Sequence, residues 1–99
     1  MYKIRIRVKK IDGKCPVLNE TDEYLVDEDG QTLRIVKGDK LCLYALSSLI
    51  PFLPTLSRDL PSGFWMNKDL IYFTCPDPGK AFGGSATVIF ELKREKVSK

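Results

Sequence analysis

The first residues of the chain alternate between apolar and cationic side chains, and this alternation constrains the fold more than any other feature. The apolar residues are Tyr2, Ile4, Ile6 and Val8, and the cations between them are Lys3, Arg5, Arg7 and Lys9. A period of two predicts a β-strand with one face against a core and the other face in water or against a partner. The chain must therefore build a sheet that is covered on at least one side.

Four further segments have the composition of strands. Residues 24–26 and 32–36 flank the sequence Asp27-Glu28-Asp29-Gly30, and an Asp-Gly turn between apolar runs predicts a hairpin. Residues 70–74 are aromatic and β-branched, and residues 86–93 close the chain with Val88, Phe90 and Leu92 on one face. A rigid Cys-Pro-Asp-Pro-Gly turn separates these last two segments.

One region is strongly helical. Residues 41–50 are apolar on most sides, which is typical of a helix buried by the core or by a partner. We expect Asp39 to be the N-cap, and Pro51 and Pro54 to end this helix and begin a short second one. The order of elements predicts an α+β fold, a mostly antiparallel sheet of about five strands packed against a Pro-broken helical hairpin. Residues 1–99 are expected to form a single domain.

Composition limits the cellular setting. The 99 residues carry a formal net charge of +3 and are 43% hydrophobic, which is ordinary for a globular domain. The most apolar segment, residues 41–56, is shorter than the roughly 20 residues of a membrane span and contains two prolines. The alternating N-terminus does not resemble a secretory signal. We therefore expect a cytoplasmic protein with no membrane partner.

The sequence contains no histidine, the commonest general base and metal ligand in proteins. A histidine-based triad within one chain is thereby excluded, as is a mixed Cys/His zinc site. The glycines at 79, 83 and 84 do not form a phosphate loop, because a strand rather than a helix follows them. No residue pattern identifies the protein as an enzyme, and the sequence requires no cofactor.

The main chemical candidates are three cysteines, Cys15, Cys42 and Cys75. No two of them form a CxxC motif, and their spacing does not match a disulfide framework. Both observations favour a protein that resides in a reducing compartment. Cys42 is expected in the first turn of the helix, where free N–H groups stabilise a thiolate, and Cys15 and Cys75 each precede a proline that fixes the local backbone. Convergent thiolates would bind a soft metal or perform redox chemistry. The alternative is three unrelated, inert cysteines in the core.

Two sets of charged residues complete the candidates. Asp77, in the turn after Cys75, either positions that turn for the cysteine site or bonds its own backbone. The cationic face formed by Lys3, Arg5, Arg7 and Lys9 could bind an anion such as a nucleic acid. Because no aromatic residue alternates with these cations on the same face, a solvated strand face is favoured over nucleic-acid binding.

The segments 41–46, 48–53 and 74–78 together resemble a family of small proteins of unknown function. The resemblance rests on an early cysteine, a Leu-Cys helix start, a helix broken at proline and a Cys-Pro-Asp-Pro turn. It implies a site shared by the three cysteines, and it brings no established activity. The chain departs from the family pattern at Leu43, where proline is expected, and in lacking a histidine after Cys15.

These observations lead to three alternative functions. The first is a three-cysteine thiolate site, with Cys42 as the reactive thiol, Cys15 and Cys75 as co-ligands or resolving thiols, and Asp77 positioning the turn. The second is a protein-interaction or homodimerisation module that uses the apolar helix, without catalytic activity. The third is weak nucleic-acid binding through the basic N-terminal strand.

Overall fold

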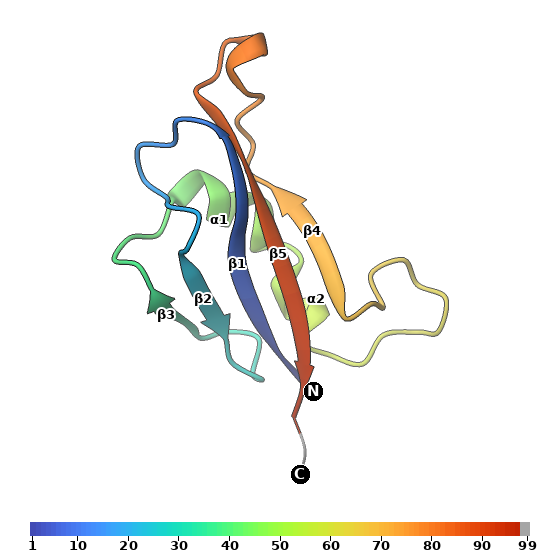
Figure 1. The fold of residues 1–99 in the computed structure, drawn as a ribbon. Helices are drawn as coiled ribbons and strands as arrows, with labels where there is room; N and C mark the ends of the chain where they lie inside the picture. Colours follow the sequence, from blue (N-terminus) through green and yellow to red (C-terminus); the bar gives the residue numbers. More distant parts are fainter. Residues whose placement is uncertain (98–99) are drawn as a thin grey trace.

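The computed structural model describes residues 1–97 of the chain. One antiparallel sheet forms the body of the protein. Within that range the strands are β1 (Tyr2–Gly13), β2 (Glu23–Val26), β3 (Leu33–Lys37), β4 (Leu70–Thr74) and β5 (Ala86–Lys96). Their order across the sheet is β3-β2-β1-β5-β4, with every neighbouring pair antiparallel (Figure 1). The predictions of five strands and of an α+β fold are confirmed.

The two long central strands supply the core. Ile6 lies opposite Leu92 and Val8 opposite Phe90, and all four side chains are buried. These residues form the core-facing side of β1 that the alternation at the N-terminus predicts. The register shifts between Val8 and Lys10. Beyond this bulge, Ile11 pairs with Val88 on the same inner face, so β1 continues to Gly13.

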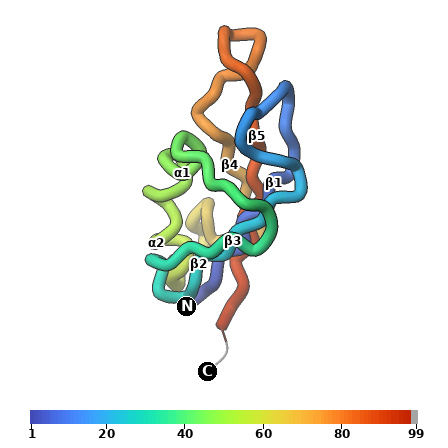
Figure 2. Tube along the Cα trace, turned by 90° about the vertical axis from the view of Figure 1, so that its left-hand side faces the viewer, coloured from blue at the N-terminus to red at the C-terminus, as the bar shows by residue number. Residues whose placement is uncertain are grey.

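Helices α1 (Leu43–Leu49) and α2 (Leu53–Leu56) lie on one side of the sheet, as the side view in Figure 2 shows. Both pack their buried residues, Ala45 and Leu49 of α1 and Leu53 and Leu56 of α2, into the core cluster. The break at Pro51 and Pro54 is confirmed, with Pro54 in the first turn of α2. A helical hairpin is not confirmed, since α2 has only four residues.

The predicted N-cap was wrong. Cys42, not Asp39, is the N-cap residue of α1, so it precedes the first turn instead of lying within it. The Tyr24 hydroxyl donates a hydrogen bond of 2.6 Å to the Lys40 carbonyl, which holds the chain across β2 before the helix can begin. Burial raises the pKa of Tyr24 to about 12.

Near its C-terminal end, β5 carries a buried cation. Arg94 is 5% exposed and donates to the carbonyls of Leu56 and Arg58 and to the Asn67 side chain, at 2.8–3.1 Å. Its guanidinium also lies 4.0 Å from the centre of the Tyr2 ring. These contacts join the end of α2 and the following loop to the central strands.

Candidate functional site

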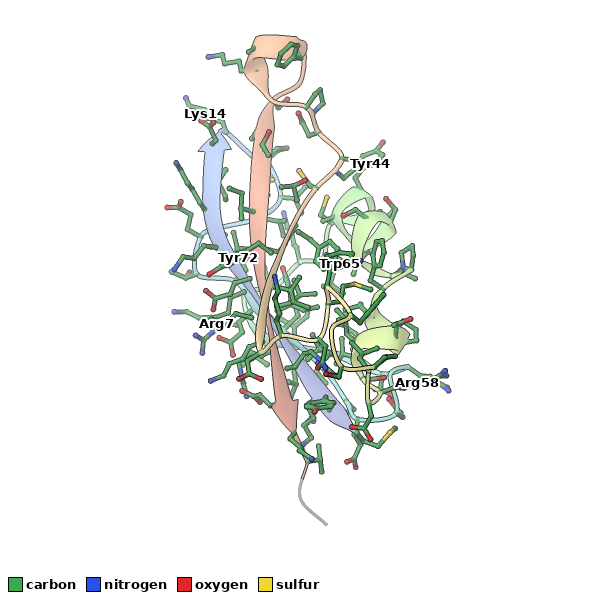
Figure 3. All side chains as sticks on the ribbon, turned by 90° about the vertical axis from the view of Figure 1, so that its right-hand side faces the viewer. Arg7, Lys14, Tyr44, Arg58, Trp65 and Tyr72 are labelled. Carbon is green, nitrogen blue, oxygen red and sulfur yellow. The ribbon has the colours of Figure 1, made fainter. Side chains whose placement is uncertain are left out.

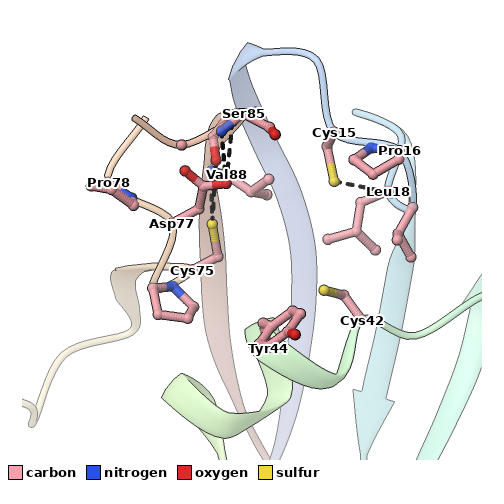
Figure 4. Close-up of a pocket in the computed structure, with 14 residues that line it drawn as sticks. Cys15, Pro16, Leu18, Cys42, Tyr44, Cys75, Asp77, Pro78, Ser85 and Val88 are labelled. Carbon is pink, nitrogen blue, oxygen red and sulfur yellow. Dashed lines mark hydrogen bonds between the residues drawn. The ribbon is translucent and has the colours of Figure 1, made fainter. Parts of the chain in front are cut away.

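The three cysteines lie around one cavity, although they come from three separate segments. The cavity has a volume of about 510 Å³ and opens between the loop after β1, the start of α1 and the turn that joins β4 to β5 (Figure 4). It is lined by residues 15–18, Cys42, Tyr44, residues 75–78, residues 84–86 and Val88. Most of this wall is apolar, which is typical of sites for small organic molecules.

Cys75 forms a buried part of the wall. Its sulfur accepts a hydrogen bond from the Val88 N–H at 3.3 Å, and its thiol lies 3.8 Å from the Ala86 carbonyl. The Cys75 N–H donates to the Val88 carbonyl at 3.0 Å, so the pairing of β4 with β5 extends to this residue. Cys75 is therefore held firmly against β5.

Cys15 and Cys42 are half-buried, and both are free thiols. The Leu18 N–H donates to the Cys15 sulfur at 3.4 Å, which closes a short loop beside Pro16. Figure 4 shows the sulfurs of Cys15 and Cys42 directed toward the space between the three segments. Tyr44, 76% exposed, lies at the rim of the same cavity.

Asp77 holds the turn above the cavity. Its carboxylate accepts hydrogen bonds from the N–H groups of Gly79, Ser85 and Ala86 at 2.8, 3.1 and 3.4 Å. The Gly79 bond, followed by the Ser85 bond, holds the pKa of Asp77 below its usual value. Any side chain at residue 84 would overlap the Asp77 carboxylate, so the turn requires Gly84. Both carboxylate oxygens are thus engaged with the backbone.

The cysteines share a cavity without forming an evident metal cage. Among residues 1–97, no group of three or more Cys, Asp or Glu side chains is placed to hold a metal ion. The arrangement instead presents individual sulfurs on an apolar wall, which suits a soft, largely apolar ligand.

The cationic strand face is partly neutralised by neighbouring strands. Arg5 bonds Glu23 at 2.6 Å and Glu95 at 3.0 Å, Arg7 bonds Glu23 at 2.8 Å, and Lys9 lies 3.7 Å from Glu91. Burial alone would raise the pKa of Glu23, but the hydrogen bonds from Arg5 and Arg7 outweigh it and lower the pKa. This pairing leaves less positive charge for an anionic partner than the sequence of β1 alone indicates.

Two aromatic side chains lie at positions that the sequence pattern does not predict. Tyr72 lies on the same outer face as Arg7, whereas Tyr44 and Trp65 lie on the helical side (Figure 3). Tyr44 belongs to the apolar helical segment that the sequence predicts to be buried by the core or by a partner, yet it lies at the cavity rim. The signal that could have found it is its position two residues after Cys42 at the exposed end of the helix.

No protein-family model, curated protein or solved structure matches the chain. Among the described residues, no helix has the length and apolar character needed to cross a membrane.

Proposed function

We propose that the protein binds a small apolar molecule in the three-cysteine cavity, with thiols as the groups that contact it. The observation that supports the proposal is the convergence of Cys15, Cys42 and Cys75 on one cavity. A volume of about 510 Å³ falls within the range of roughly 300–1,000 Å³ found for ligand sites. Free thiols persist in a reducing compartment, so we also propose a cytoplasmic location.

The wall of the cavity indicates the character of the ligand. Pro16, Val17 and Leu18 face it from one side, and Pro76 and Pro78 face it from the other. Asp77, a carboxylate in the lining, already accepts three backbone hydrogen bonds and offers little capacity to a ligand. A molecule that enters this cavity therefore gains mainly from removing apolar surface from water.

An environment-sensitive apolar dye, N-phenyl-1-naphthylamine, tests this proposal. We expect saturable binding with enhanced fluorescence, weakened about 10-fold or more by Cys42→Phe, because the larger side chain occupies ligand volume. Leu43→Phe is the matched control, since Leu43 is 81% exposed and does not line the cavity. Absence of dye binding, or equal weakening by both variants, would refute the cavity as a ligand site.

A second candidate is homodimerisation through α1. Leu43 and Tyr44 of α1 and Ile50 at its C-cap are 81%, 76% and 55% exposed, and the sequence predicts that this apolar segment is buried by the core or by a partner. Exposed apolar side chains of this size on one short helix favour an interface. The partner would be a second copy of the chain, whose own α1 offers the same surface to a two-fold contact.

Light scattering coupled to size exclusion tests the dimer. The mass should rise from monomer to dimer with concentration, and Leu43→Glu should shift this transition to higher concentration by about 10-fold or more. Leu70→Glu is the control, because Leu70 is exposed on β4. A strict monomer at high concentration would remove this candidate.

A further inference from the structure

The composition of the cavity wall limits the polarity of the ligand that it can hold. The wall consists largely of carbon and sulfur, and its one carboxylate, on Asp77, is occupied by backbone N–H groups. A polar ligand would find few partners here and would lose its hydration. An apolar ligand would be accepted, and the groups best placed to distinguish one apolar ligand from another are the thiols.

The three sulfurs differ in how the protein holds them. The Cys75 sulfur is buried and accepts the Val88 N–H, and the Cys15 sulfur accepts the Leu18 N–H. In the described part of the chain, the Cys42 sulfur makes no capping hydrogen bond to the first turn of α1. Cys42 is also half-buried, and its sulfur points into the cavity (Figure 4). Of the three, Cys42 is the one whose sulfur can turn toward a bound molecule without giving up a hydrogen bond to the described residues.

We infer that Cys42 is a covalent attachment site for apolar α,β-unsaturated carbonyl compounds bound in this cavity, an inference that rests on the proposed function. In the reaction, the thiol proton passes to solvent water and a sulfur lone pair forms a bond to the β-carbon of the ligand. The π-electrons of the C=C bond move onto the carbonyl to give an enolate. Water then protonates the α-carbon. The net change is addition of S–H across C=C, with no oxidant or reductant.

The cavity would direct this reaction by holding the alkyl chain beside the sulfur. Proximity converts a bimolecular addition into a reaction within a complex, which raises its rate for ligands that fill the apolar space. Tyr44, at the rim, offers an aromatic face against which a conjugated carbonyl group can pack. Small electrophiles that cannot fill the cavity gain little of this advantage.

Two enones with the same reactive group test the inference, methyl vinyl ketone and pentyl vinyl ketone. Adduct formation is followed by intact-mass spectrometry, the site is located by peptide mapping, and glutathione is the reference thiol. The rate ratio of the pentyl to the methyl compound should exceed the glutathione ratio by about 10-fold or more, since each buried methylene favours binding by about fourfold. The saturated analogue ethyl pentyl ketone should slow the reaction competitively, and Cys42→Ser should abolish the selective adduct while Cys15→Ser retains it.

The outcomes separate the two proposals. Binding of the apolar dye without any chain-length preference at Cys42 would overturn the covalent site and leave the ligand cavity standing. Absence of dye binding together with equal enone selectivity for the protein and for glutathione would overturn both. A selective adduct on Cys15 in place of Cys42 would also overturn the assignment. The competition measurement and the peptide mapping use the wild-type protein, so together they test the assignment even where a variant fails to fold.

Discussion

The three cysteines line one cavity but have different surroundings, and the reactivity of each thiol should follow its surroundings. Cys75 is buried and its sulfur accepts a hydrogen bond from the Val88 N–H of β5, whereas Cys15 and Cys42 are half-buried at the cavity. In native protein, we expect a thiol reagent such as dithionitrobenzoate to modify two cysteines, with Cys75 reacting roughly 100-fold more slowly because its exposure requires local opening. Peptide mapping after partial modification identifies each site. Equal rates for all three thiols would contradict the burial of Cys75.

The Asp77 carboxylate should stabilise the turn above the cavity in a pH-dependent way. Its pKa is lowered in the folded protein by the Gly79 and Ser85 N–H groups, below the 3.8 of an ordinary aspartate. Its contribution to stability is therefore fully present above the unfolded pKa and is lost as the pH falls through the folded pKa. Asp77→Asn should lower the urea midpoint at pH 7, and the difference from wild type should shrink as the pH falls below about 4.

Asp29 provides a matched control for this prediction. Its carboxylate accepts the N–H groups of Gln31 and Thr32 in the β2–β3 turn, and these bonds lower the pKa of Asp29. Asp29→Asn should show the same direction of pH dependence. Only Asp77→Asn should also weaken dye binding, because only Asp77 lines the cavity. Equal dye affinity in the two variants would show that the Asp77 turn does not shape the site.

At the scale of the elements, the sequence predicts the strands and helices that follow from a local residue pattern. It does not predict their exact bounds or the sites that depend on contacts between distant residues. The alternation in β1 reveals the strand, but consecutive lysines at 9 and 10 conceal its continuation, which the bulge and pairing with β5 make possible. Asp39 has a side chain typical of an N-cap. However, the Lys40 carbonyl accepts a hydrogen bond from the Tyr24 hydroxyl, and α1 begins only at Leu43. Likewise, the three cysteines can be selected from the sequence, whereas their convergence depends on how three loops meet.

Arg94 connects β5 to the end of α2 and to the loop that follows it. The sequence pattern does not reveal this role, because Arg94 is one of several cations near the C-terminus. Replacing it by methionine would leave the carbonyls of Leu56 and Arg58 and the Asn67 side chain without this donor. We expect Arg94→Met to lower the free energy of unfolding by about 3 kcal/mol, measured by urea denaturation. Lys93→Met on the exposed side of the same strand should change it by less than about 0.5 kcal/mol. A similar effect of both variants would mean that the Arg94 bonds contribute little.

At the scale of the whole molecule, the two ends of the chain form the centre of the sheet. Tyr2 pairs with Lys96, and the pairing of β1 with β5 is what joins β2 and β3 to β4 in one sheet (Figure 1). This topology favours a single cooperative unit, and the single domain expected from the sequence stays a prediction. It also places the cavity at the junction of three loops, each anchored to this unit by a strand or helix.

Thermal unfolding can test this cooperativity with two probes in different parts of the fold. Far-UV circular dichroism reports the sheet, while Trp65 fluorescence reports the loop after α2, which Arg94 joins to β5 through Asn67. If the described fold is one unit, the two transitions should coincide within about 1 °C in wild-type protein. Arg94→Met should separate them, with the fluorescence change at the lower temperature, because the loop loses its connection to the central strands. An early fluorescence transition already present in the wild type would show that this loop unfolds independently of the sheet.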